Sequence, residues 1–259
     1  MKNLIIRALS GTVLVLLTFF LLFKGGLFTS LYIFILSMIG TREFYAALEN
    51  IGIRSIKEIG YISCIGFLFY SLNVERLFLK LMVLIIIVLL IVLSLIRKAN
   101  FKDLFITLVG IFYIPFLFQH IIYLEGSIYL WLVFIIAWGT DTFAYLTGML
   151  FGKTKLCPKI SPKKTVEGSI GGILGAVILT FFYTNYFNLF PMWKFILISM
   201  MGAVLAQVGD LTASKIKRIT GIKDYGFIMP GHGGVLDRFD SILFIAPYVY
   251  YSTNLLFNL

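Results

Sequence analysis

The chain has 259 residues, of which 60% are hydrophobic and only 13% are charged. Because this balance lies far outside that of soluble domains, it excludes a water-soluble enzyme and predicts one membrane-embedded domain over residues 1–259. The net charge of +10 lies in short connections between apolar runs, which indicates membrane topology and excludes a nucleic-acid-binding face.

Apolar runs recur along the whole chain. A helix needs roughly 20 apolar residues to cross about 30 Å of hydrocarbon, and about nine segments meet or approach this length. They cover residues 4–23, 26–41, 58–73, 77–96, 103–123, 128–151, 169–187, 193–212 and 235–257. The expected fold class is therefore all-α, a polytopic integral membrane protein with about nine transmembrane helices.

The basic residues of the connections predict the orientation. If the N-terminus is cytoplasmic, Arg42, Arg54 and Lys57 lie inside, as do Arg97 and the two most basic loops. Cytoplasmic loops are enriched in Lys and Arg, so we expect a cytoplasmic N-terminus and an external C-terminus.

Two of the predicted cytoplasmic loops are both long and strongly basic. Residues 152–168 include Lys163, Lys164 and Glu167, and residues 213–234 include Lys217 and Lys223. Because both loops emerge on one face, their cations can bind one anionic ligand. The alternative is that they only set the orientation and contact anionic lipid headgroups.

Carboxylates inside apolar helices are costly unless they are paired, hydrated or bound to metal. Asp141, Asp210, Asp237 and Asp240 lie in three such segments. Asp237 and Asp240 are three residues apart and share a helix face, a spacing suited to a hard cation such as magnesium. The alternative is a charge network with Arg238 and neighbouring cations that holds helices together.

Glycines mark two places where backbone approaches a neighbour. The run Gly231-His232-Gly233-Gly234 precedes the last apolar segment, where helix amides favour a phosphate. His232 is a candidate to donate to that phosphate or to make a structural hydrogen bond. A second set of glycines predicts close helix packing at the start of the 169–187 segment. Its members are Gly168, Gly171, Gly172 and Gly175.

The C-terminal half resembles the phosphatidate cytidylyltransferase (CDP-diacylglycerol synthase) family. The motifs that carry the resemblance are Ser214-Lys-Ile-Lys-Arg218, Lys223-Asp224, Pro230-Gly-His232-Gly-Gly and Asp237-Arg-Phe-Asp240. Similar upstream motifs are Asp141-x-x-Ala144-Tyr145, Ser161-Pro-Lys-Lys-Thr165-Val-Glu167 and Gln207-x-Gly209-Asp210. Residues 128–259 are accordingly expected to be the catalytic half, and residues 1–127 the N-terminal helices.

This resemblance implies transfer of the cytidylyl group of CTP to phosphatidate in phospholipid biosynthesis, giving CDP-diacylglycerol and pyrophosphate. It implies a site that faces the cytoplasm in the bacterial inner membrane, and a homodimer. The implied metal ligands are Asp210, Asp237 and Asp240, for Mg²⁺ or Mn²⁺, with a second, monovalent cation as a further expectation. Lys223 joins them as a catalytic residue. The implied substrate-binding residues are Ser214, Lys217, Arg218, His232, Gly233, Gly234, Arg238, Lys163, Lys164, Glu167 and Asp141.

Two other functions compete with this one. A cation-coupled transporter also carries intramembrane carboxylates and glycine-interrupted helices, although the two halves of this chain show no matching pair of broken helices. A CTP-dependent lipid kinase would transfer the γ-phosphate instead of the cytidylyl group. The products of CTP turnover separate the three functions.

Overall fold

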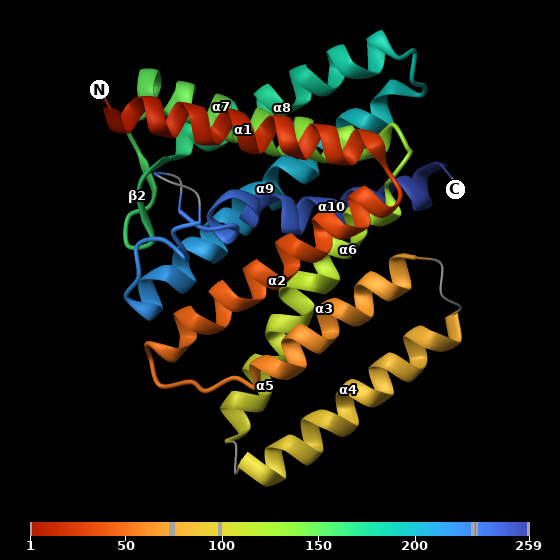
Figure 1. The fold of residues 1–259 in the computed structure, drawn as a ribbon. Helices are drawn as coiled ribbons and strands as arrows, with labels where there is room; N and C mark the ends of the chain where they lie inside the picture. The colour runs from red at the N-terminus through yellow and green to blue at the C-terminus, as the bar shows by residue number, and fades with distance from the viewer. Residues whose placement is uncertain (1, 73–75, 98–99, 229–230, 232, 258–259) are drawn as a thin grey trace. The chain divides into compact units, whose positions relative to one another are not determined.

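The structure is a computed structural model that describes residues 2–72, 76–97, 100–228, 231 and 233–257 (Figure 1). In chain order its elements are α1 (Lys2–Lys24), α2 (Leu27–Glu49), α3 (Lys57–Ser71), α4 (Arg76–Arg97), α5 (Phe101–Ile111), η1 (Phe112–Phe116), α6 (Leu117–Tyr123), α7 (Tyr129–Phe151), β1 (Lys155–Cys157), β2 (Ser161–Thr165), α8 (Val166–Tyr186), α9 (Met192–Thr220) and α10 (Leu236–Phe257).

Every predicted apolar segment coincides with a helix. The segment 103–123 consists of α5, η1 and α6, joined at a π-helical turn that contains Pro115, a residue without a backbone N–H to donate. In the part of the chain that the structure describes, 5 helical runs are long and apolar enough to cross a membrane. The polytopic membrane character is thus confirmed, whereas nine crossings and their orientation stay predictions.

The structure corrects two predicted helix boundaries and adds a hairpin that was not predicted. Helix α2 continues to Glu49 instead of ending at residue 41, so Arg42 lies within a helix and not in a connection. Helix α9 continues to Thr220, so the first part of the predicted loop 213–234 is helical. The loop 152–168 contains an antiparallel hairpin of β1 and β2, which the all-α prediction omitted. Residues such as Lys155 and Ser161 lie in short strands there because each pairs across the hairpin.

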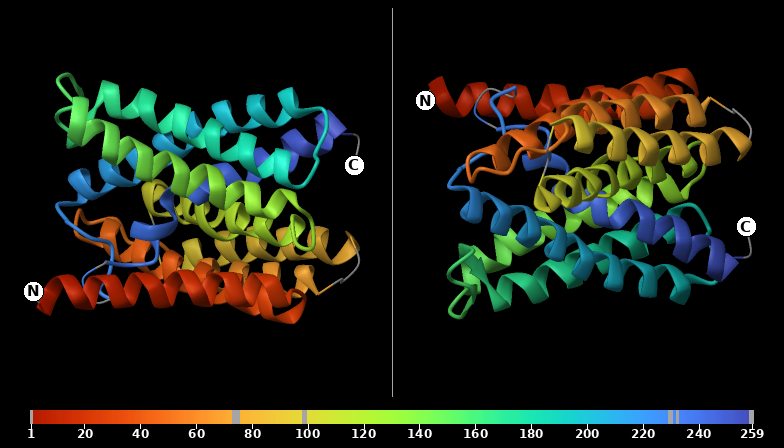
Figure 2. Two further views of the ribbon diagram at one scale, coloured as in Figure 1. Left: turned by 90° about the horizontal axis from the view of Figure 1, so that it is seen from above. Right: turned by 90° about the horizontal axis from the view of Figure 1, so that it is seen from below.

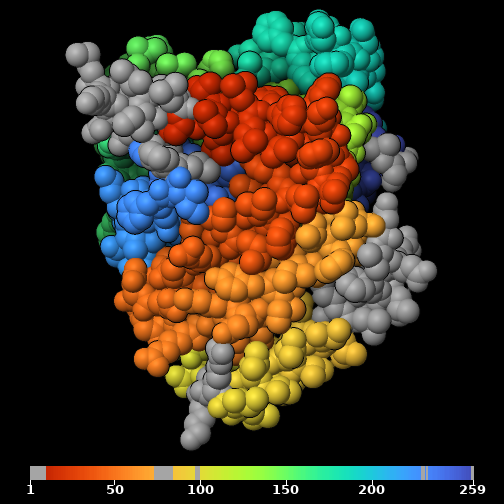
Figure 3. All heavy atoms as spheres, viewed as in Figure 1, coloured from red at the N-terminus to blue at the C-terminus, as the bar shows by residue number. Residues whose placement is uncertain are grey.

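The chain divides into two compact units, and the first comprises Met1–Gly126 with Ile219–Arg238. Tyr45 of α2 lies at its centre with no exposed surface, and its hydroxyl donates to the Thr107 carbonyl at 2.8 Å. A Cβ on Gly60 or Gly110 would lie 2.5 or 2.3 Å from the Tyr45 ring, so both helices approach closely there. Figure 3 shows α2 and α3 side by side on this unit's surface.

The second unit comprises Ser127–Arg218 with Phe239–Leu259. Helices α7 and α8 lie side by side along their length, with the hairpin at one end (Figure 2). The glycines of α8 face α7, since a Cβ on Gly171 would lie 2.1 Å from the Thr147 hydroxyl and one on Gly175 would lie 2.1 Å from Phe143. The predicted close helix packing at these glycines is confirmed.

Candidate active site

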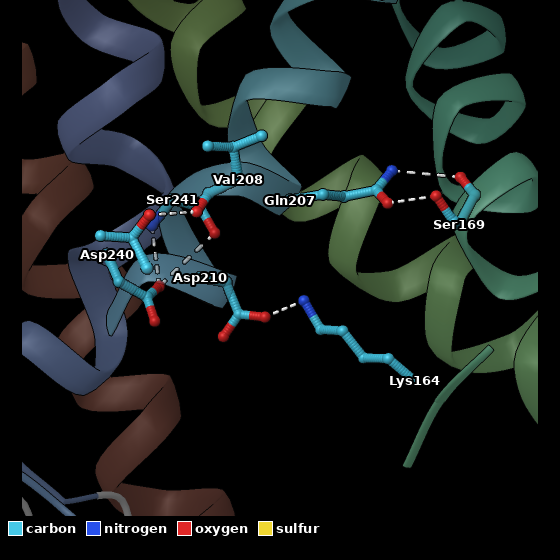
Figure 4. A network of polar contacts seen from close by, with 8 residues as sticks. Lys164, Ser169, Gln207, Val208, Asp210, Asp240 and Ser241 are labelled. Atoms are coloured by element: carbon cyan, nitrogen blue, oxygen red, sulfur yellow. Dashed lines mark hydrogen bonds and ion pairs between the residues drawn. The ribbon is translucent and has the colours of Figure 1, made fainter. Parts of the chain in front are cut away.

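An ion pair joins two of the predicted site residues in the second unit. The ammonium of Lys164, in β2, contacts the Asp210 carboxylate of α9 (Figure 4). The hairpin holds Lys164 in place, because Lys155 pairs with Thr165 and Cys157 with Ser161. Residues more than 40 positions apart in sequence therefore meet through the hairpin.

Asp240 lies beside this ion pair because α9 and α10 approach each other closely. A Cβ on Gly209 would lie 2.6 Å from the Asp240 carbonyl oxygen, so only glycine permits this contact. The Asp240 side chain is buried, and its Oδ1 accepts the Ser241 backbone N–H at 2.8 Å. Lys217 and Lys164 lie close enough to interact electrostatically with Asp240. Buried negative charge and convergent lysines therefore share one region of the unit.

A cavity of about 300 Å³ adjoins Lys164. Its lining comprises Asp141, Ala144, Tyr145, Gly148, Met149, Leu156, Lys163, Lys164, Thr165, Gly168, Ser169 and Gln207. Burial lowers the pKa of Lys164, and the negative charges of Asp141 and Asp240 oppose that shift. Both carboxylates thus lie within electrostatic range of the ammonium that borders the cavity. The ammonium groups of Lys163 and Lys164 in this lining can bind an anionic group.

Two sets of hydrogen bonds hold the segments that form the cavity and the hairpin beside it. Gln207 of α9 and Ser169 of α8 form a reciprocal pair, in which the Gln207 amide donates to the Ser169 carbonyl at 3.1 Å and the Ser169 hydroxyl donates to the Gln207 side-chain oxygen (Figure 4). Glu167 accepts the backbone N–H groups of Lys153 and Thr154, each at 3.1 Å. Glu167 therefore holds the start of the hairpin, and its predicted role toward the nucleotide stays a prediction.

The end of α9 contacts the hairpin tip. The Arg218 guanidinium donates from Nε to the Ile160 carbonyl at 3.2 Å. Ser214 and Lys217 lie on the same helix, four residues and one residue before Arg218, although we predicted all three in a loop. The first residues of the second basic segment thus contact the hairpin within this unit, whereas residues 219–234 belong to the first unit.

In the first unit, Asp237 holds the loop that precedes α10. Its Oδ2 accepts the backbone N–H of Tyr225 at 2.7 Å and that of Gly234 at 2.9 Å. Gly233 has a φ of 86°, which favours glycine, and a Cβ there would lie 2.7 Å from the same carboxylate oxygen. Lys223 is exposed in this loop.

Arg238 and His232 are two further predicted substrate-binding residues. Arg238 is exposed in the first turn of α10. His232, for which we predicted a phosphate contact or a structural hydrogen bond, lies outside the described residues.

Glu43 is a buried carboxylate that was not among the residues predicted from the sequence. This residue of α2 is 5% exposed, and its two carboxylate oxygens accept the backbone N–H groups of Val235 at 3.0 Å and Leu236 at 2.9 Å. These are two of the amides at the α10 N-terminus where we expected a phosphate. If the second predicted segment had been extended through the apolar residues 44–48, it would have included Glu43 as a carboxylate inside an apolar helix.

The predicted metal ligands belong to both units. Asp210 and Asp240 lie in the second unit and Asp237 lies in the first. Within the described part of the chain, no three His, Cys, Asp or Glu side chains gather into a metal-binding group. One shared centre for all three aspartates therefore stays a prediction.

Comparison with known proteins identifies the family. Residues 5–256 match the model of the Cytidylyltransferase family. The phosphatidate cytidylyltransferase of Staphylococcus epidermidis is 35% identical over 253 residues, which cover 93% of this chain and 96% of that protein. Those of Staphylococcus saprophyticus and Staphylococcus aureus are 36% identical over 254 residues, with the same coverage. Matched over nearly its whole length, the chain belongs to the phosphatidate cytidylyltransferase family.

Proposed function

We propose that this protein transfers the cytidylyl group of CTP to phosphatidate, giving CDP-diacylglycerol and pyrophosphate. The names of its relatives supply the reaction. The structural observation that supports it most is the ion pair between Lys164 and Asp210 beside the cavity of the second unit. It brings a cation from one family motif to a carboxylate from another, next to buried Asp240.

The reaction needs no protein nucleophile. A phosphate oxygen of phosphatidate attacks the α-phosphorus of CTP, a new P–O bond forms, and the bond to the β-phosphate oxygen breaks as pyrophosphate leaves. The two reactants are both anionic, so catalysis consists of aligning them and neutralising their charge. In this proposal Lys163 and Lys164 hold phosphates at the cavity, while Lys217, Arg218 and Lys223 hold the others and Ser214 donates its hydroxyl.

The carboxylates fit a magnesium ion. Asp210 and Asp240 offer only oxygen ligands, and a buried carboxylate such as Asp240 needs a compensating cation nearby. Magnesium commonly takes one or two protein carboxylates and completes its shell with water and substrate phosphates, so a gathering of three side chains is not required. When bound, the ion would supply charge stabilisation at the α-phosphate and the leaving pyrophosphate. Asp237 would share its carboxylate between this role and the loop amides.

The lipid substrate places the site at the membrane surface. Phosphatidate keeps its acyl chains in the bilayer while CTP comes from water, so the site must be reached from both. Asp210 lies in the C-terminal half of α9, near the end of the predicted apolar segment 193–212. With the predicted orientation this end is cytoplasmic, where CTP is available. The protein is accordingly an integral membrane enzyme whose site faces the cytoplasm, and a homodimer stays a prediction.

Labelled CTP tests this proposal against its competitors. Purified protein in detergent receives phosphatidate, magnesium and CTP labelled at either the α- or the γ-phosphorus. Label from the α-position in the lipid product, with pyrophosphate released, is the expected result, and a chelator should abolish it until magnesium is restored. Label from the γ-position in the lipid would identify a kinase. Absence of turnover, with cation-driven uptake into vesicles, would identify a transporter.

A further inference from the structure

Glu43 lies in an environment where a carboxylate requires a specific reason. It is 5% exposed and belongs to α2, one of the helical runs apolar enough to cross a membrane. A carboxylate at such a position costs several kcal/mol unless partners compensate. Its partners are the Val235 and Leu236 amides, and the positive end of the α10 dipole favours the negative charge there.

The loop before α10 is shaped around this carboxylate. A Cβ on Gly226 would lie 2.4 Å from the Glu43 Oε1, and one on Gly234 would lie 2.3 Å from the same atom. Real Cβ atoms do not approach so closely, so both glycines leave room for Glu43. The backbone therefore surrounds the Glu43 carboxylate from two points of the loop, eight residues apart in sequence.

Asp237, in the first turn of α10, binds further backbone amides of the same loop. Its Oδ2 accepts the amides of Tyr225 and Gly234, the immediate neighbours of the residues that Glu43 contacts. Glu43 and Asp237 thus divide between them the consecutive amides of Gly234, Val235 and Leu236. Lys223 lies two residues before Tyr225 in sequence.

We propose that Glu43 is a positioning residue for the cytidylyl transfer, which holds the described residues 223–228 and 233–234 and the first turn of α10 in the geometry that the reaction requires. This inference rests on the proposed function, because that function assigns Lys223 and Asp237 to the site. Glu43 itself contacts backbone amides and not the reacting atoms. In this arrangement the carboxylate replaces the phosphate that glycine-rich loops before helices often bind.

The test uses the full-length protein in detergent and three variants. Glu43→Gln keeps the side-chain size but turns one of its acceptors into a donor that faces an amide. Gly226→Ala leaves Glu43 intact and displaces it with a methyl group. Glu49→Gln is the matched control, because Glu49 lies on the same helix but is exposed and pairs with Lys57 at 2.8 Å. Each is measured for kcat, for KM of both substrates, and for amide hydrogen exchange.

We expect Glu43→Gln and Gly226→Ala each to lower kcat by about 10–100-fold, the range typical of changes to residues that hold a metal ligand in place, here the proposed ligand Asp237. Both KM values should stay near those of the wild type, since the variants remove alignment and not ground-state binding. Exchange at residues 235 and 236 should become faster in both, while α3 keeps its protection. Glu49→Gln should match the wild type in every measurement.

Two results would overturn the inference. Wild-type kcat in Glu43→Gln would show that the loop needs no such support. A loss of kcat only in proportion to unfolded protein, with unchanged exchange at 235 and 236 in the folded fraction, would show a general stability role. Failure of the proposed function is a separate result, because the wild type itself would then produce no CDP-diacylglycerol, while the exchange data would still decide whether Glu43 holds the loop.

Discussion

The Lys164 ammonium in the hairpin forms an ion pair with the Asp210 carboxylate in α9. This pair links the motif of residues 161–167 with the motif of residues 207–210. It also places a lysine whose pKa is lowered by burial at the edge of the cavity. The paired strands of the hairpin thus hold the Lys164 ammonium against α9.

Removal of the Lys164 charge should impair catalysis. A hydrogen bond to a charged group contributes about 1.5–3 kcal/mol, and about 1.4 kcal/mol corresponds to a tenfold change in rate. Lys164→Gln should therefore lower kcat/KM for CTP by about 10–100-fold. Lys159→Gln in the hairpin turn is the control and should retain wild-type activity. Equal losses in the two variants would contradict a specific role for Lys164 and indicate a general effect of hairpin charge.

The contact between α7 and α8 should tolerate no added side chain. In Gly175→Ala the new methyl would lie 2.1 Å from Phe143, so the helices must separate. Such overpacking typically costs about 1–3 kcal/mol, and the midpoint of thermal unfolding in detergent should fall. Leu174→Ala, on the exposed face of the same helix, should change this midpoint little. Similar midpoints for Gly175→Ala and the wild type would refute the close approach.

The native cysteines test the predicted orientation. Cys157 lies half-buried in the hairpin, which we expect on the cytoplasmic side, and Cys64 is 1% exposed. A membrane-impermeant maleimide should therefore label the protein in inverted vesicles but not in right-side-out vesicles. Cys157→Ser should abolish this labelling, while denatured protein should react at Cys64 in every sample. Labelling of Cys157 in right-side-out vesicles would mean that the orientation is reversed.

Hydropathy predicted the helices because burial in lipid requires long apolar runs, and this requirement is local in sequence. Asp237 and Asp240 were placed on one helix by the same logic. The predicted ends of α2 and α9 were wrong because the count of apolar residues stopped before Arg42 in the first case and before the polar and basic residues 214–218 in the second. A helix continues beyond that point where tertiary contacts satisfy the charge, as the amides of Val235 and Leu236 do for Glu43.

The remaining errors concern contacts between distant segments. Glu43 and Val235 are 192 residues apart, and no spacing rule connects them. The hairpin was missed because Ser161-Pro-Lys-Lys-Thr165 lacks the apolar–polar alternation of a typical strand and contains only one β-branched residue, Thr165. Its short strands form because they pair with each other and because Glu167 holds the Lys153 and Thr154 amides.

CTP turnover by Asp240→Asn is the decisive measurement for the proposed cytidylyl transfer. The detergent-purified wild type and variant are compared with phosphatidate and magnesium, with Glu58→Gln, an exposed carboxylate of α3, as the control. We expect the wild type and the control to release pyrophosphate and form CDP-diacylglycerol. Asp240→Asn should lose at least about 100-fold in rate, because charge stabilisation by a bound metal contributes several kcal/mol. Wild-type turnover by a folded Asp240→Asn protein would show that Asp240 has no part in the reaction.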